Sequence, residues 1–194
     1  MITFTKIAKY DTGKNALNQY EYICKLLDQS INPPSLEPKS IDCRAYNAIL
    51  CSPLIRAMES IMSSDTQPIV YREELREIAF DFRKMTSEND YASCGSNAVR
   101  ASFCEAFSED RLNLSLQEIE KQIRTLFKQI VNLQDSVIIV THSFRMVIIE
   151  SFIKTSGNLF KKPDRIYEFV NIEKKLYEFK GNFIVPKSSI ADLG

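Results

Sequence analysis

The single histidine of this 194-residue chain is the first candidate for chemistry. His142 follows the run from Val137 to Thr141, whose β-branched residues are typical of a strand that is buried on both faces. The residues after it, from about Arg145 to Lys154, have the apolar spacing of a helix. His142 is therefore expected between the carboxyl end of a buried strand and the start of a helix, where α/β sheets bind anions. The simpler interpretation is a histidine that caps the turn.

An arginine lies at a second junction of this kind. Residues 46–51 predict a buried strand, and Ser52 and Pro53 favour the start of a helix directly after it. Arg56 would lie in the first turn of that helix, where its planar guanidinium can bind a phosphate through two hydrogen bonds. An ordinary salt bridge is the simpler interpretation of Arg56. The apolar stripe expected for this helix consists of Ile55, Met58, Ile61 and Met62.

A carboxylate between these two segments is a candidate acid or base. Glu77 belongs to the stretch L-R-E-I-A-F at residues 75–80. If its side chain is partly buried, the carboxyl group can hold a proton near neutral pH and transfer it to a leaving oxygen. The simpler interpretation is a solvated carboxylate, because Glu73, Glu74 and Arg76 make this a charged run.

Charge and cysteine content argue against several functions. Lysines and arginines number 25, as do aspartates and glutamates, so no net positive charge favours a nucleic acid or an anionic membrane as a partner. Five widely spaced cysteines and one histidine form no zinc pattern, and we expect neither a metal nor a cofactor. This cysteine usage favours reduced thiols in the cytoplasm. No apolar run approaches the roughly 20 residues that span a bilayer. The sequence carries no indication of an oligomeric state.

Strands and helices alternate along the chain, which predicts an α/β fold. Apolar periodicity predicts helices at about 17–27 and 116–130, and Ser115 with Glu118 forms a capping box before the second helix. Further strands are expected at residues 2–8, 68–71, 167–170, 175–179 and 183–185. We therefore expect one domain over residues 1–194, a three-layer α/β/α sandwich with a mostly parallel central sheet. Residues 83–113 show no clear period and are interpreted as an excursion over the sheet edge.

Three of these segments, taken in order, resemble motifs of the histidine phosphatase superfamily, which has the phosphoglycerate mutase-like fold. Ser52–Ala57 matches the family's S-P-L-x-R-A segment, Leu75–Phe80 is similar to its L-R-E-x-x-F-like loop, and Val140–Ser143 to its late V-S-H-G segment. The ordered set is more specific than any one motif. The likeness extends to the capped helix before the histidine strand and to the E-F-x-G turn at 178–181, so it covers nearly the whole chain. Residues 83–113 would then lie over the binding crevice.

The resemblance implies a role for each matched residue. Arg56 would hold a phosphate, with Ser52 beside it. Lys6 or Lys9 would stand as a point charge in place of the family's first arginine. Glu77 would be the proton donor or acceptor. His142, in its cationic form, would offset the negative charge that develops on the transferring phosphoryl group. The ligand would be a phosphorylated or other anionic small molecule.

The amino-terminal strand departs from the family pattern. Active members have R-H-G there, and its histidine is the nucleophile that becomes phosphorylated, whereas this chain has no second histidine. Distance from the start puts Ile7 at that position, and other registers put Lys9 or Tyr10 there. None of these residues supplies an imidazole, so the phosphohistidine route is closed. Ser143 and Phe144 also stand where the family's late motif has glycine. Their side chains would narrow the path by which a substrate approaches the helix start.

Three other side chains are candidates for a replacement nucleophile or base. The thiolate of Cys51 can be activated at a helix start, although a cysteine in a buried strand is more often a small hydrophobe. Tyr10 has a high pKa for a nucleophile. Asp11, near the end of the first strand, can serve as a base.

These observations lead to three hypotheses of function. The first is a degenerate family member, a pseudoenzyme that keeps an anion-binding crevice around Arg56 and His142 and has a binding or regulatory role. The alternative is an enzyme with rerouted chemistry on a phosphorylated or carboxylated small molecule, in which His142 and Glu77 are the acid and base. Enzymes from which the nucleophile has been removed still accelerate their reaction by about 10³ to 10⁴ over the rate in water. The third is a structural partner protein in which the crevice is vestigial.

Overall fold

The computed structural model describes residues 1–6, 19–34, 41–63, 67–133, 136–159 and 182–194. Within these residues, a five-stranded sheet has the order β5-β3-β6-β1-β7. The strands are β1 (Ile2–Lys6), β3 (Ala48–Cys51), β5 (Ile69–Tyr71), β6 (Val137–Thr141) and β7 (Asn182–Val185). The first four strands of that order are parallel, and β7 is antiparallel to β1. The prediction of a mixed α/β fold with a mostly parallel sheet is confirmed.

The register of the parallel strands brings the candidate segments to one edge of the sheet. Cys51 at the end of β3 pairs with Val140 of β6, and Lys6 at the end of β1 pairs with Thr141. All five residues of β6 are buried, as its run of β-branched residues predicts. The residues that follow β3 and β6 therefore meet at the carboxyl ends of adjacent strands, where open α/β sheets form their crevices.

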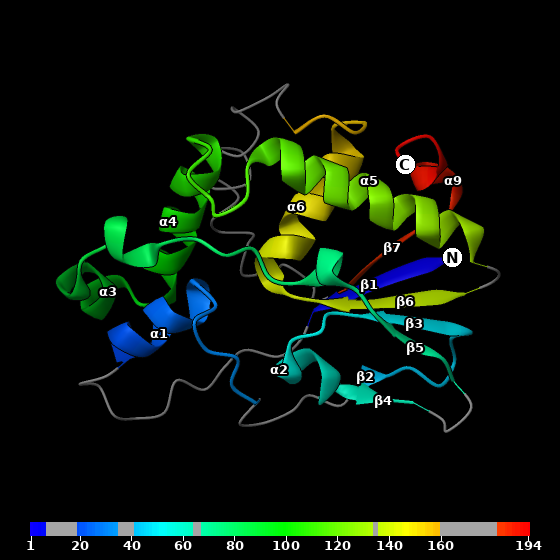
Figure 1. Ribbon diagram of the computed structural model, residues 1–194, viewed down its shortest axis with the longest axis horizontal. Coiled ribbons are helices and arrows are strands. Elements are labelled where there is room, and N and C mark those ends of the chain that lie inside the picture. Colours follow the sequence, from blue (N-terminus) through cyan, green and yellow to red (C-terminus); the bar gives the residue numbers. More distant parts are fainter. Residues whose placement is uncertain (7–18, 35–40, 64–66, 134–135, 160–181) are drawn as a thin grey trace.

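Two long helices cover one face of the sheet (Figure 1). They are α5 (Leu116–Asn132) and α6 (Ser143–Lys154), and the short helix α9 (Ser188–Ala191) packs beside α5. The predicted capping box is present, because the Ser115 hydroxyl accepts from the Glu118 amide and the Glu118 carboxylate accepts from the Ser115 amide. The buried stripe of α5 consists of Leu116, Ile119, Ile123, Leu126, Phe127 and Ile130.

The opposite face is covered by smaller elements (Figure 1). These are α2 (Ile55–Met58) and a two-stranded parallel sheet of β2 (Ile41–Asp42) and β4 (Ile61–Met62). They cover the buried cluster of Ile41, Cys43, Ile49, Cys51, Ala57, Ile138 and Val140. Together with the helices of the first face, α2 gives the sheet helices on both sides.

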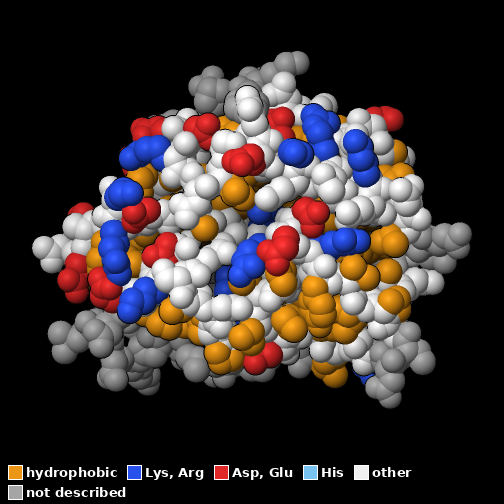
Figure 2. All heavy atoms as spheres, in the orientation of Figure 1, with side chains coloured by type: hydrophobic (Ala, Val, Ile, Leu, Met, Phe, Trp, Pro, Cys, Tyr) orange, Lys and Arg blue, Asp and Glu red, His pale blue; other side chains and the backbone are white. Residues whose placement is uncertain are grey.

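The prediction of a helix that starts at Ser52 and carries a long apolar stripe is wrong. It spans only Ile55–Met58, because the chain then enters strand β4, which pairs with β2. The side chains of Ile55, Met58 and Met62 are 40%, 39% and 43% exposed instead of buried. Figure 2 shows apolar side chains on the surface over this part of the molecule.

The remaining described elements lie at the carboxyl end of the sheet (Figure 1). They are α1 (Gln19–Leu27), the 3₁₀ turns η2 (Glu73–Leu75) and η3 (Phe82–Lys84), α3 (Glu88–Cys94) and α4 (Ser96–Ser108). The predicted excursion at 83–113 thus contains α3 and α4. One continuous cluster of buried apolar side chains joins α1, α4, α5 and α6. The strands predicted at 167–170 and 175–179 lie outside the described residues, whereas 183–185 falls in β7.

Candidate functional site

Ser52 and His142, which follow adjacent strands, are in direct contact. The Ser52 Oγ and the His142 Nε2 lie 2.7 Å apart, and both side chains are buried. Burial, followed by the charges of Arg56, Arg145 and Arg76, holds the pKa of His142 well below its usual value. The imidazole is therefore neutral near pH 7, and it can hold an anion or a hydroxyl by hydrogen bonding but adds no positive charge.

Positive charge at the site comes from guanidinium groups. Arg56, the second residue of α2, is buried next to the Ser52 turn. Burial lowers the pKa of Arg56 to about 10, and the charge of Glu77 opposes this shift. Arg56 is thus charged at neutral pH and lies close enough to both Glu77 and His142 to affect their titration.

The carboxylate of Glu77 caps helix α6. It accepts hydrogen bonds from the backbone N–H groups of Arg145 at 2.9 Å, Ile78 at 3.0 Å and Phe144 at 3.4 Å. His142 occupies the N-cap position but its side chain makes no cap hydrogen bond, so the turn is capped from a different segment. Burial raises the pKa of Glu77, although these hydrogen bonds and the charge of Arg56 oppose the shift. The proposed acid or base role of Glu77 stays a prediction.

Sequence reasoning missed Arg145, which was placed only as the start of a helix. Its side chain is buried, and it donates from Nε to the Arg76 carbonyl at 2.8 Å and from Nη2 to the Gln122 Oε1 at 3.0 Å. Burial lowers the pKa of Arg145 to about 10. Arg145 therefore fixes the Glu77 loop to helices α5 and α6. The sequence feature that could have indicated this role is an arginine inside the otherwise apolar run F-R-M-V-I-I at residues 144–149.

The first-strand candidates are only partly described. Lys6 ends β1 beside Thr141, but its side chain is not among the described ones. The candidates for the nucleophile position and its neighbouring base lie outside the described residues: Ile7, Lys9, Tyr10 and Asp11.

Cys51 has the features of a buried hydrophobe. Its side chain, at the end of β3, is fully buried in the apolar cluster on the α2 face of the sheet. Burial raises the pKa of the Cys51 thiol to about 12. A thiolate at this position is therefore strongly disfavoured near neutral pH.

The described residues contain neither a membrane-spanning helix nor a metal cluster. No described helix has the length and apolar character needed to cross a bilayer. No group of three or more histidine, cysteine, aspartate or glutamate side chains in this part of the chain is arranged to hold a metal ion.

The fold and the site define an α/β protein that gathers buried polar and cationic side chains at the carboxyl ends of parallel strands. The family model of the histidine phosphatase superfamily (branch 1) matches residues 39–162. The chain belongs to this superfamily. The matched segment contains Ser52, Arg56, Glu77 and His142, and it begins after strand β1. No curated protein matches the chain.

Proposed function

We propose that the protein binds phosphate or a phosphorylated small molecule at Arg56, Ser52 and His142, with Lys6 beside them, and has a binding or regulatory role. One observation carries this proposal: the buried guanidinium groups of Arg56 and Arg145 both lie close enough to the buried His142, which contacts Ser52, to affect its titration. These two cationic groups lie at the ends of parallel strands, where a dianion would offset their charge.

The proposal includes the loss of phosphohistidine chemistry. The only histidine of these 194 residues is His142, in the late motif. A histidine nucleophile divides the hydrolysis of a phosphate ester into two easier displacements, and Ile7, the residue assigned to its position, has no lone pair for this. We therefore propose a pseudoenzyme that retains the anion site. The five free cysteines, three of them buried, support the proposal of a cytoplasmic location.

Thermal unfolding with inorganic phosphate tests the binding proposal. At about 100 times the dissociation constant, phosphate is expected to stabilise the fold by about 2.7 kcal/mol, or roughly 5–10 °C in Tm. Arg56→Lys keeps the charge but loses the bidentate fork, and it is expected to weaken phosphate binding about tenfold or more. Arg44→Lys is the matched control, because Arg44 makes a forked pair with Asp42 on the surface.

The same protein is assayed for phosphate release from a panel of phosphate esters. The proposal expects saturable stabilisation without release. Rapid release through an acid-labile phosphoenzyme would refute the loss of phosphohistidine chemistry. An unchanged Tm at every phosphate concentration would instead support a structural partner protein with a vestigial crevice.

A second candidate function is an enzyme with rerouted chemistry. It is favoured by the 2.7 Å contact of the His142 Nε2 with the Ser52 Oγ and by the raised pKa of Glu77. A neutral imidazole can accept a proton, and a carboxyl group of raised pKa can donate one. This candidate predicts turnover of a phosphorylated or carboxylated substrate that His142→Ala abolishes. Turnover that survives His142→Ala would exclude it.

A further inference from the structure

The turn after α1 contains a residue that is unusual for its backbone conformation. Gln29 has a φ of 61°, in the left-handed region that residues with a side chain occupy only at a cost in free energy. Chains usually place glycine, or sometimes asparagine, at such a position after a helix. Strain of this kind persists only where surrounding contacts hold it, and it clusters at functional sites. The contacts of the Gln29 side chain therefore indicate why it stands here.

Both ends of the Gln29 amide are bonded to the loop that carries Glu77. The Gln29 Nε2 donates to the Glu77 carbonyl at 2.5 Å, and the Gln29 Oε1 accepts from the Arg76 Nε at 2.8 Å. Because a carbonyl can only accept and a guanidinium can only donate, the two partners fix which way the amide points. The amide oxygen is therefore presented to the Arg76 guanidinium.

The Arg76 side chain also contacts Glu73, but this contact holds it less firmly. The Arg76 Nη1 lies 2.9 Å from the Glu73 Oε2, and the two side chains are 36% and 71% exposed. An ion pair in contact with water adds little stability and is screened by salt. The half-buried Gln29 amide is therefore the partner that fixes the direction of the Arg76 guanidinium.

Arg76 lies beside the groups proposed to bind the anion. Its backbone carbonyl accepts from the buried Arg145 Nε at 2.8 Å, and the next residue, Glu77, caps the start of α6. Burial is the main cause of the lowered pKa values of Arg56 and His142, and the charge of Arg76 contributes to both shifts. Arg56 and Arg145 are buried, whereas the side chain of Arg76 reaches solvent. Arg76 is therefore the guanidinium of this group that an anion in solution can meet directly.

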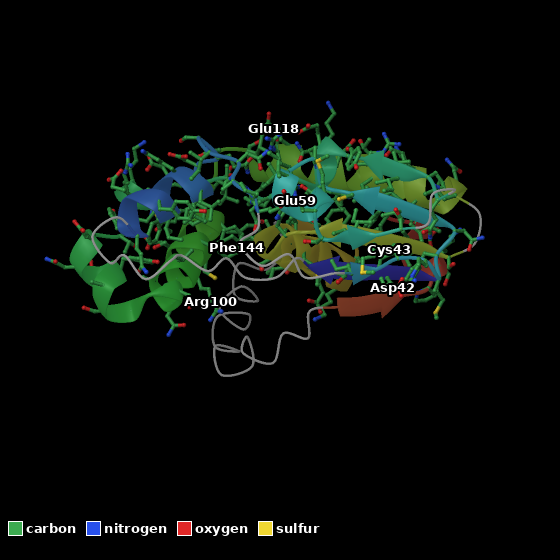
Figure 3. All side chains as sticks on the ribbon, turned by 90° about the horizontal axis from the view of Figure 1, so that it is seen from below. Asp42, Cys43, Glu59, Arg100, Glu118 and Phe144 are labelled. Carbon is green, nitrogen blue, oxygen red and sulfur yellow. The ribbon has the colours of Figure 1, made fainter. Side chains whose placement is uncertain are left out.

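The same turn also contacts the start of α2. The Asn32 Oδ1 accepts from the backbone N–H of Ile55, the first residue of α2, at 3.2 Å. In Figure 3, Glu59, just after α2, and Phe144, near the start of α6, both lie between α1 and the strands of the sheet. The turn after α1 is thus bonded to two segments that border the site, the start of α2 and the loop around Glu77.

We propose that Gln29 is a positioning residue of the anion site: it orients Arg76, and Arg76 gives the bound anion a guanidinium contact in addition to that of Arg56. This rests on the proposed function, because it concerns the same site. The direction of Arg76 matters because the bonds of a guanidinium to an oxyanion are directional and frequently bidentate. Glycine at position 29 would fit the backbone but lack the amide, so it should weaken binding while the fold is kept.

Phosphate titrations by thermal unfolding of the full chain compare Gln29→Gly with the wild type. Without phosphate the variant is expected to have a Tm close to that of the wild type, because relief of the backbone offsets the lost hydrogen bonds. It is expected to bind phosphate about fivefold more weakly, which corresponds to the loss of one hydrogen bond. Ser156→Gly is the matched control, because Ser156 is an exposed residue with a φ of 53° in the turn after α6. It should gain the same backbone relief and bind phosphate as the wild type does.

A double-mutant cycle with Arg76→Met separates positioning from a general effect on the fold. If Gln29 acts through Arg76, Gln29→Gly should weaken phosphate binding in the wild type and have no further effect in Arg76→Met. An equal fall in affinity in both backgrounds would show that Gln29 acts by another route and would overturn the proposal. If the glycine variant does not fold, Gln29→Met takes its place in the cycle, because methionine has similar bulk and no amide.

The outcomes separate the positioning role from the proposed function. If phosphate binds to the wild type and equally well to Gln29→Gly, the positioning role is refuted while the proposed function stands. The same holds if Arg76→Met alone leaves the phosphate affinity unchanged, or if Ser156→Gly weakens binding as much as Gln29→Gly does. If phosphate leaves the Tm of the wild type unchanged, the proposed function fails and the positioning role fails with it.

Discussion

Replacing Glu77 by alanine should destabilise the protein far more than its position in a charged run suggests. Two backbone donors, the N–H groups of Arg145 and Ile78, would lose acceptors at 2.9 and 3.0 Å. A buried donor left without an acceptor costs about 1–3 kcal/mol, so these two give a loss of about 2–6 kcal/mol in the free energy of unfolding. The bond from the Phe144 N–H is longer, at 3.4 Å, and adds little.

Urea denaturation at pH 7 measures this loss. Glu77→Gln is expected to lose less than Glu77→Ala, because its carbonyl oxygen can still accept from Arg145 and Ile78. Glu73→Ala is the control, since Glu73 is an exposed carboxylate of the same run, paired with Arg76, and such pairs are worth about 0–1 kcal/mol. If Glu77→Ala costs no more than Glu73→Ala at an unchanged denaturant slope, the capping role of Glu77 is refuted.

Three further predictions concern titration, thiol reactivity and capping. The buried His142 resists protonation, whereas in the unfolded chain it becomes protonated below about pH 6.5. The free energy of unfolding of the wild type, relative to that of His142→Gln, should therefore decrease as the pH falls below about 6.5. The decrease should reach up to about 1.4 kcal/mol per pH unit. Equal pH profiles of the two proteins in urea denaturation would contradict this. Iodoacetamide followed by mass spectrometry should label the exposed Cys94 and leave the buried Cys51 unlabelled, and early labelling of Cys51 would show an accessible thiolate. Ser115→Ala should cost about 1 kcal/mol in urea denaturation, because it removes one half of the capping box on α5; a neutral result would mean that the cap is not formed in solution.

The parts of the fold that local pattern determines were predicted from the sequence. The β-branched run before His142 marks β6 because a strand buried on both faces tolerates few other residues. Once Cys51 and Thr141 are recognised as ends of parallel strands, the approach of Ser52 to His142 follows from sheet geometry. Hydrophobic periodicity was sufficient to predict these elements because it is read along a short stretch of chain. Parallel pairing was sufficient to predict their meeting because it has a fixed register.

The contacts that long-range pairing determines were not predicted. Ile61 and Met62 fit the helical stripe by spacing, yet they form β4 because Ile41 and Asp42, some 20 residues earlier, provide its partner strand. The cap of α6 joins Glu77 to an amide 68 residues later in the chain. A local period carries no information about such partners, and this is why the sequence suggested His142 as the cap of its own turn.

The position of Glu77 bears on the proposed binding of an anion at this site. Helix starts attract anions because their first backbone amides lack partners, but in α6 the amides of Phe144 and Arg145 already donate to the Glu77 carboxylate. Under the proposed function, an external phosphate would gain little from the helix start, and its binding would come from Arg56 and from the Ser52 and His142 side chains. The carboxylate that completes the helix also neutralises part of the charge of the two buried arginines. The same carboxylate thus completes the helix cap and, under the proposed function, would compete with an anionic ligand for Arg56.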